Sequence, residues 1–199
     1  MNELNAEQEL QFIKQIMEDS RKVVDDGRDM IVWGVLVAAG MVINFINFEF
    51  QQICSDIILW IFIIAVGWFF SFWSWKRKQR TKPVRTFGVK ILSNVWLSCG
   101  IAMTIIGFVF PLSGMVSDQS IMPLLAMILG IGYFISGAVQ DERWVKNLAF
   151  GWWGGAMCMV AIQGAYMYLL FGAMITLFQT IPGVIFFKNV HFSASKENK

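Results

Sequence analysis

Charged residues are scarce in this chain of 199 residues: they make up only 15% of it, whereas hydrophobic residues make up 56%. Such a composition is too apolar for a water-soluble domain. Disordered segments are poor in aromatic residues, and the 18 Phe and 9 Trp therefore exclude disorder. Only three Cys are present, with no CxxC spacing, which excludes a disulfide framework. The composition indicates a membrane protein.

Residues typical of catalysis or metal binding are also scarce in the apolar runs. The single histidine, His191, follows the last run, so axial haem ligands and a multi-histidine metal site are excluded. No Asp, Glu, Lys or Arg lies inside the runs, which argues against proton-coupled transport and against a voltage sensor. Intramembrane hydrolases need a nucleophile with a base in reach, and no such pair is seen. We expect no catalytic, cofactor-binding or metal-binding residue and no enzymatic activity.

Six apolar runs are long enough to cross a bilayer as helices, which takes about 20 residues. They are residues 30–48, 57–75, 91–112, 121–140, 147–163 and 166–187. The last two come from one uncharged stretch, and a polar amide and a glycine near Gln163, Gly164 and Ala165 place the joint between them. Pro182 falls late in the last helix, where a kink or neighbouring helices must absorb the missing N–H. The predicted fold class is all-α, a polytopic transmembrane bundle of six helices in three hairpins.

All 16 Lys and Arg fall on one side of these six spans. They lie in residues 1–29, 76–90, 141–146 and 188–199, whereas the other side carries only the acids Glu49, Asp56 and Asp118. The positive-inside rule therefore predicts an inner-membrane protein with both termini in the cytoplasm. A polar, acid-rich stretch precedes the first span, so we expect that span to be retained rather than cleaved as a signal peptide.

The basic loop from Lys76 to Lys90 resembles a nucleic-acid patch only in composition. Topology already explains it, and cations beside a membrane attract anionic lipid headgroups by about 1 kcal/mol each. We expect membrane lipids as partners of this loop and no nucleic acid.

Residues 1–29 predict a cytoplasmic amphipathic helix. Asn5 and Gln8 have the spacing of a capping box, and the stripe Leu10, Ile13, Met17 and Val24 follows. Residues 5–26 hold six acids against three cations, which weakens a membrane-surface interpretation. Two interpretations stay open: the stripe binds a second copy or a cytoplasmic regulatory protein, or it folds back onto the basic loop of its own chain.

A resemblance rests on the same N-terminal stretch. The run Glu9-Leu10-Gln11-Phe12-Ile13-Lys14-Gln15-Ile16-Met17-Glu18-Asp19-Ser20, followed by Trp33-Gly34, resembles a group of bacterial six-helix integral membrane proteins without an assigned activity. The resemblance implies the same architecture and location. It also implies a link to transcription regulation, because some members are encoded beside small winged-helix regulators. It implies no catalytic residue.

Small residues are spaced four apart in the first, third and fifth spans: Gly34 and Ala38, Ser98 and Ala102, Gly151 and Gly155. Such spacing lets helix backbones approach closely in a membrane. It predicts that the odd-numbered helices pack together at the centre of the bundle. Trp33, Trp96 and Trp153 in the same helices suggest a faint threefold repeat.

Tryptophan prefers the headgroup level of a membrane, which gives a check on the span ends. Seven Trp fall at or near the predicted cytoplasmic ends: Trp33, Trp73, Trp75, Trp96, Trp144, Trp152 and Trp153. Trp68 is close to mid-span, and we therefore expect it to pack against another helix.

Uncharged polar residues support the two functional hypotheses differently. Interhelical hydrogen bonds are the usual role of such residues and are worth about 0.6 kcal/mol on average. They fit the leading hypothesis, a non-enzymatic scaffold or regulatory interaction protein. The alternative is a small-molecule transporter or channel, in which Asn44, Asn47, Asn94 and Gln163 line a polar path. A polar cavity or broken helices at the midplane would favour that alternative.

Overall fold

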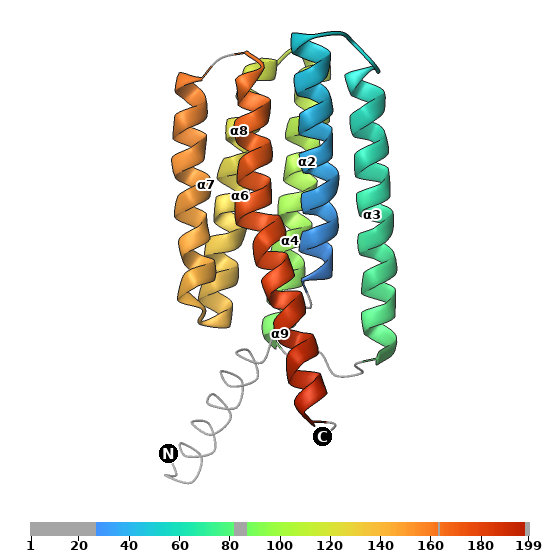
Figure 1. Ribbon diagram of the computed structural model, residues 1–199, viewed down its shortest axis with the longest axis vertical. Helices are drawn as coiled ribbons and strands as arrows, with labels where there is room; N and C mark the ends of the chain where they lie inside the picture. Colours follow the sequence, from blue (N-terminus) through green and yellow to red (C-terminus); the bar gives the residue numbers. More distant parts are fainter. Residues whose placement is uncertain (1–26, 82–86, 163, 198–199) are drawn as a thin grey trace, which may run out of the picture.

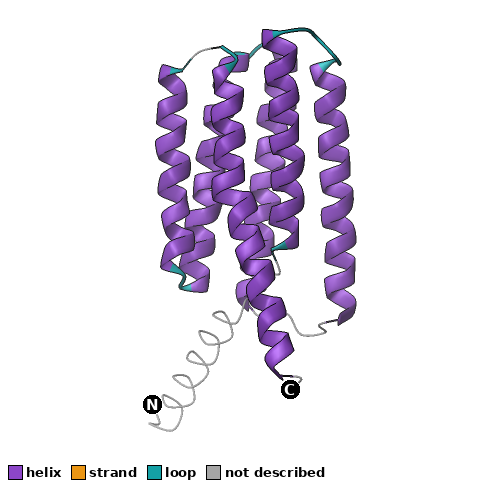
Figure 2. Ribbon diagram, in the orientation of Figure 1, coloured by secondary structure: helices purple, strands orange, loops and turns teal. Residues whose placement is uncertain are grey.

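The computed structural model describes residues 27–81, 87–162 and 164–197. Within these ranges the chain forms helices joined by short turns (Figure 2). The predicted cytoplasmic helix at residues 5–26, together with its motif, and Gln163 lie outside the described residues.

Six helical rods run up and down side by side (Figure 1). Four rods are single α-helices: α2 (Arg28–Glu49), α3 (Asp56–Thr81), α6 (Asp118–Gln140) and α7 (Arg143–Ala161). The third rod joins α4 (Phe87–Thr104), the π-helical turn η1 (Ile105–Val109) and α5 (Phe110–Ser113). The sixth rod joins α8 (Tyr166–Ile175), η2 (Thr176–Thr180) and α9 (Ile181–Glu197). The joint between the last two rods lies where it was predicted, since α7 ends at Ala161 and α8 begins at Tyr166.

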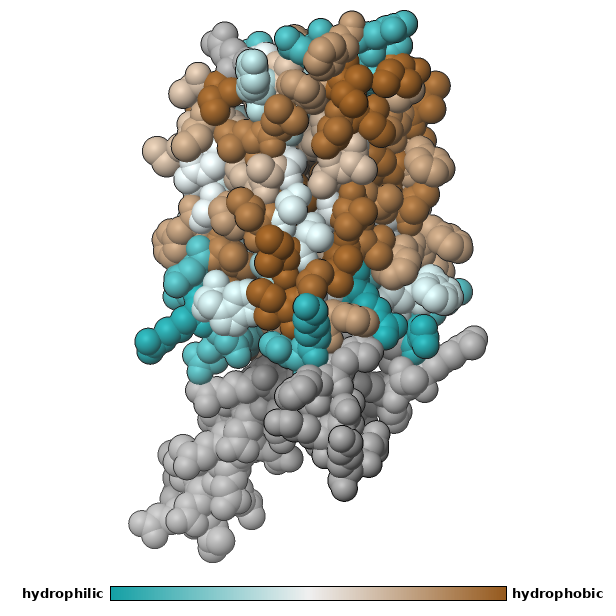
Figure 3. Space-filling model, in the orientation of Figure 1, coloured by the Kyte–Doolittle hydropathy of each residue, from teal (hydrophilic) through white to brown (hydrophobic). Residues whose placement is uncertain are grey.

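Five of the rods are long and apolar enough to cross a membrane. The exception is α7, in which Arg143, Lys146 and Asn147 occupy the first turns and lower the mean hydropathy. It nevertheless lies antiparallel beside α6, between the same two ends of the bundle (Figure 1). The surface carries a broad apolar belt with hydrophilic side chains gathered at its ends (Figure 3). The fold is therefore all-α, with five to six helices able to span a bilayer.

Each π-helical turn ends two residues before a proline. Pro111 is the second residue after η1, and Pro182 is the second residue after η2. A proline removes one backbone donor and crowds the preceding turn, and a widened turn relieves both effects. The sixth rod bends at this point, and α9 leaves the line of α8 (Figure 1). Of the two alternatives expected at Pro182, a kink or support from neighbouring helices, the structure shows a kink (Figure 1).

The buried core is contributed mainly by α6, α7 and α8. Their largest fully buried side chains are Trp152, Tyr133, Phe171 and Met159. The main partners of α2 are α3 and the sixth rod, and α4 packs mainly on α6. Among the described helices, α2, α4 and α7 thus make no substantial contact with one another. The prediction that the odd-numbered helices pack together is wrong, because their small residues receive side chains from even-numbered rods.

Tryptophan rings lie on glycines of neighbouring helices. Ring atoms approach the position that a Cβ would occupy in five such pairs: Trp33 and Gly67, Trp60 and Gly40, Trp68 and Gly100, Trp96 and Gly132, Trp153 and Gly130. The predicted packing role of Trp68 is therefore confirmed. Trp152 is not a boundary residue as predicted: it lies near the middle of α7 and is fully buried against Tyr133 and Phe171.

Candidate functional site

The described Lys and Arg residues gather at the end of the bundle where α2 begins (Figure 1). Those with described side chains are Arg28, Lys76, Arg77, Lys90, Arg143, Lys146 and Lys188. The acids Glu49, Asp56 and Asp118 lie at the opposite end, at the ends of α2, α3 and α6. The bundle is therefore electrically polarised along its long axis. We call the basic end the cationic rim.

Several cations of the rim lie over aromatic rings. Lys76 Nζ is 4.6 Å from the ring centroid of Phe72, and Lys146 Nζ is 4.7 Å from that of Phe134. The Arg77 guanidinium carbon is 5.9 Å from the Trp73 ring centroid. Such pairs are favourable by about 0.5–1 kcal/mol when exposed. They hold positive charge directly above an aromatic layer, an arrangement suited to phosphate headgroups.

Two polar contacts join α2 to α3 just inside the rim. Trp33 Nε1 donates to Ser71 Oγ at 2.9 Å, and Ser74 Oγ donates to Asp29 Oδ2 at 3.3 Å. The serines are three residues apart and therefore share a face of α3. These contacts position the beginning of α2 against α3.

The three described residues that were predicted to line a polar path differ in their surroundings. Asn47 organises the turn between α2 and α3: its Nδ2 donates to Asp56 Oδ1 at 2.7 Å and to the Cys54 carbonyl at 3.0 Å, and its Oδ1 accepts from Ile53 N at 2.9 Å. Asn94 is exposed on α4. Asn44 is 7% exposed, and its Oδ1 has no hydrogen-bond partner among the described residues.

The small residues predicted for helix packing mostly face the sixth rod. A Cβ on Gly34 would meet Thr180, one on Gly151 would meet Phe178, and one on Gly155 would meet Met174. In the third rod, Ser98 is exposed and donates to the Asn94 carbonyl at 2.9 Å, and Ala102 is half-buried. The glycines therefore do serve close helix contacts, with bulky partners rather than with one another.

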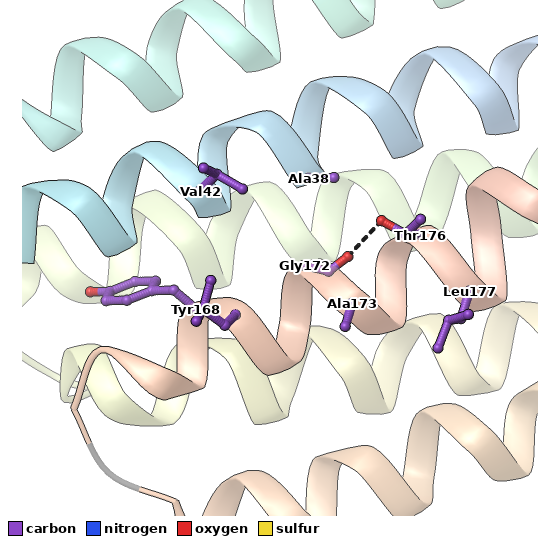
Figure 4. Close-up of a pocket in the computed structure, with 8 residues that line it drawn as sticks. Ala38, Val42, Tyr168, Gly172, Ala173, Thr176 and Leu177 are labelled. Atoms are coloured by element: carbon purple, nitrogen blue, oxygen red, sulfur yellow. Dashed lines mark hydrogen bonds between the residues drawn. The ribbon is translucent and has the colours of Figure 1, made fainter.

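A shallow hollow of about 420 Å³ lies between α2 and the sixth rod (Figure 4). Its lining is Ala38, Val42, Tyr168, Leu169, Gly172, Ala173, Thr176 and Leu177. The Thr176 hydroxyl is engaged internally, because Oγ1 donates to the Gly172 carbonyl at 2.9 Å (Figure 4). Asn44, Asn47 and Asn94, which are the described residues among the four predicted for a path, do not line the hollow. The adjacent small residues Gly172 and Ala173 leave room for this hollow, but they were not among the residues predicted from the sequence to form a site.

In the described part of the chain, no group of three His, Cys, Asp or Glu could hold a metal ion. Of the cysteines, Cys99 is buried, Cys54 is half-buried in the turn after α2, and Cys158 is exposed on α7. The chain matches no protein-family model, no curated protein and no solved structure. Functional inference therefore rests on the geometry described above.

Proposed function

We propose that the protein is a non-enzymatic, six-span protein of the bacterial inner membrane, with both termini in the cytoplasm. Its cytoplasmic face acts as a platform that binds a regulatory partner or a second copy through residues 5–26. The observation that carries this proposal is the polarised bundle, with its cations at one end and three acids at the other. Positive charge marks the cytoplasmic side of membrane proteins.

The sixth span of the proposal is α7. Its buried stripe Val145, Ala149, Trp152, Ala156 and Met159 recurs at spacings of three and four, and its contacts with α6 run along the whole hairpin. A helix held in this way needs less apolar surface than one that faces lipid on all sides. The hydropathy shortfall of α7 is therefore compatible with a span that packs on a neighbour.

The packing of the interior supports an interaction role over the transporter alternative. The core consists of apolar and aromatic side chains contributed mainly by α6, α7 and α8. The hollow beside it is apolar and opens toward the outside of the bundle. A solute path needs polar groups that converge near the midplane. Asn47 is instead bonded within the turn at the acidic end, and Asn94 is exposed on α4.

Alkylation of Cys54 tests the proposed orientation. An impermeant maleimide added to intact cells should label Cys54, which lies in the turn at the acidic end. Cys158 is also exposed and lies only three residues before α7 ends at Ala161, so the labelling is done in a Cys158→Ser background. In that background Cys54→Ser is the matched control and should abolish the labelling, because Cys99 is buried. Labelling only after the cells are opened would place the acidic end in the cytoplasm and contradict the proposal.

Photo-crosslinking from residues 1–26 tests the platform role. In cells, photo-crosslinkers placed in this segment should capture one defined cytoplasmic protein or a second copy. The capture should persist when the hollow is filled by Ala173→Leu, which alters only the intramembrane surface. Crosslinks confined to the chain's own loop at residues 76–90 would show that the segment folds back, and would reject the platform role.

The cationic rim is proposed to bind anionic lipid headgroups. The stability of the protein in vesicles should rise with the fraction of anionic phospholipid, and Lys76→Gln with Arg77→Gln should reduce that dependence. Glu49→Gln and Asp56→Asn, at the opposite end, are the control and should leave it unchanged. Equal responses of the two pairs of variants would contradict a headgroup role for the rim.

A further inference from the structure

The hollow between α2 and the sixth rod is narrow. Its lining on the sixth rod runs from Tyr168 to Leu177, nine residues further on, which is about 14 Å along a helix. Divided by this length, the volume of about 420 Å³ gives a mean width of about 6 Å. A helix with its side chains is about 10–12 Å across, so the hollow is too narrow for a helix to enter. A single extended hydrocarbon chain is thinner and can lie in it.

The lining of the hollow suits an apolar occupant. Its side chains are apolar apart from those of Tyr168 and Thr176. The Thr176 hydroxyl donates to the Gly172 carbonyl, and the Tyr168 hydroxyl points away from the hollow, toward the end where α8 begins (Figure 4). Sites for small soluble ligands enclose most of the ligand, whereas this hollow is open toward the outside of the bundle. In a bilayer, the component that reaches it from that side is a lipid chain.

The hollow lies in the half of the bundle that is nearer the acidic end. Ala38 is at the middle of α2, and Val42 is beyond it toward Glu49. On the sixth rod, Tyr168 is the third residue of α8, and Leu177 lies in η2. Half of a hydrocarbon core is about 15 Å thick, which matches the length of the hollow. A chain that enters at the acidic end therefore fills the hollow when it reaches the midplane.

Negative charge surrounds the mouth of the hollow. Glu49, Asp56 and Asp118 lie at this end, and the described side chains there include no Lys or Arg. Asp56 and Asp118 act electrostatically on the Tyr168 hydroxyl, which places their carboxylates near the mouth. The ring of Phe48 is beside that of Tyr168, with the centroids 6.2 Å apart. Such a mouth repels a headgroup with a net negative charge and attracts an ammonium group.

We propose that the hollow binds one acyl chain of a phospholipid whose headgroup carries a primary amine, as in phosphatidylethanolamine. The ammonium group then lies among the carboxylates at the mouth, to which it donates charge-assisted hydrogen bonds. The cationic rim at the other end prefers anionic headgroups, so the two ends of the bundle select different lipids. The proposal rests on the proposed function for the membrane topology, which assigns this lipid to the outer leaflet.

Photo-crosslinking with a lipid probe tests the binding of the chain. The full-length protein is reconstituted into phosphatidylcholine vesicles that contain a trace of phosphatidylethanolamine with a diazirine midway along one acyl chain. After irradiation, the adducts are mapped by mass spectrometry, and they should concentrate on residues 38–42 and 169–177. Adducts spread evenly over all exposed helix faces would overturn the proposal, because the hollow would then hold lipid no more firmly than other surfaces do. Absence of adducts from these two segments would also overturn it, by showing that protein covers the hollow.

Filling the hollow tests whether its shape holds the chain. Ala173 is exposed and lines the hollow, so Ala173→Leu should occupy the space of the chain and remove the concentration of adducts. Ala65→Leu is the matched control, because Ala65 is an exposed alanine of α3 outside the hollow. It should leave the adduct map unchanged. Retention of the adducts in Ala173→Leu would refute the proposed site, and the wild-type map provides a test that needs no variant.

Competition between unlabelled lipids tests the choice of headgroup. Phosphatidylethanolamine should displace the probe about fivefold more effectively than phosphatidylglycerol, the factor expected for one charge near a membrane surface. Glu49→Gln with Asp118→Asn should remove this preference, whereas Lys76→Gln with Arg77→Gln, at the rim, should retain it. Equal displacement by the two lipids would overturn the headgroup assignment.

The lipid site and the platform role can fail separately. Adducts in the hollow without any protein captured by residues 5–26 would reject the platform role alone. Capture of a partner together with evenly spread adducts would reject the lipid site alone.

Discussion

Gly67→Ala is expected to destabilise the bundle because Gly67 of α3 lies under the ring of Trp33. A Cβ at this position would be 2.5 Å from Cη2 of the ring and 2.7 Å from both Cζ2 and Cζ3. The ring has little freedom to move away. Its Nε1 donates to Ser71 Oγ at 2.9 Å, and its plane makes a T-shaped contact with Trp68 at a centroid distance of 6.4 Å.

The expected size of the effect follows from three contributions. An added methyl in a filled site typically costs about 1–3 kcal/mol. Displacement of the ring also breaks the hydrogen bond to Ser71, worth about 0.6 kcal/mol in a membrane protein. This cost is offset by at most about 1 kcal/mol, because alanine has a higher helix propensity than glycine. The free energy of unfolding should therefore fall by about 1–3 kcal/mol.

The assay is unfolding in mixed micelles, followed by circular dichroism as the fraction of denaturing detergent rises. Gly132→Ala is the matched control, because the same kind of pair exists there with more space. A Cβ on Gly132 would lie 3.4 Å from Trp96 Cη2 and 3.5 Å from Cys99 Sγ, which is ordinary van der Waals contact. Its unfolding midpoint should stay at or slightly above that of the wild type.

The double variant Trp33→Leu with Gly67→Ala separates ring crowding from other causes. In the Trp33→Leu background, Gly67→Ala should no longer lower stability, because the ring that it meets has been removed. The reasoning is refuted if the methyl costs the same with and without the indole. It is also refuted if Gly132→Ala destabilises as much as Gly67→Ala does.

Three smaller predictions follow from local geometry. Asp141 has φ 55° at the turn between α6 and α7, so the backbone favours Gly over Val there. Asp141→Val should therefore be less stable than Asp141→Gly by about 1–2 kcal/mol, and equal unfolding midpoints of the two variants would contradict this. Asn47→Ala removes the hydrogen bonds that hold the turn containing Cys54. It should accelerate Cys54 alkylation without changing the global unfolding midpoint, and an unchanged alkylation rate would contradict the role of Asn47 in holding the turn. Ser136→Ala removes the acceptor of Trp96 Nε1, at 3.1 Å, and should cost about 0.6 kcal/mol in detergent unfolding, whereas no loss would show that the bond is dispensable.

Rod positions could be predicted from charge and length, but rod ends could not. Charged residues interrupt most of the apolar runs and so place most of the turns, as between Gln140 and Arg143. The helices continue past those interruptions, and α3 reaches Thr81 and α9 reaches Glu197. Long Lys and Arg side chains reach the interface from within a helix, so a charge in the sequence does not end the helix itself. Averaged hydropathy likewise missed the two-faced character of α7.

The partners of the small residues could not be predicted, for a different reason. A spacing of four shows only that one side of a helix is narrow, and it carries no information about the neighbour. Gly34, Gly151 and Gly155 all face the sixth rod, whose Thr180, Phe178 and Met174 supply the bulk. Asn47 was assigned to a polar path because the run around it is apolar. Its real partner, the Cys54 carbonyl, belongs to a turn whose conformation depends on both helices.

The repeat suggested by Trp33, Trp96 and Trp153 holds for two hairpins and fails for the third. In the first two, an indole on the first helix lies at a glycine of the second and donates to a serine four residues further along, Ser71 or Ser136. In the third, Trp153 Nε1 donates to the Met127 carbonyl of α6 at 3.3 Å. The glycines lie on α7 instead, and the sixth rod fills them. Lipid provides no hydrophobic driving force for helix association. The packing of an aromatic ring of one helix on a glycine of its neighbour therefore determines which face of each helix turns inward. In α7 it turns Gly151 and Gly155 toward Phe178 and Met174 and leaves Gly154 on the exposed side.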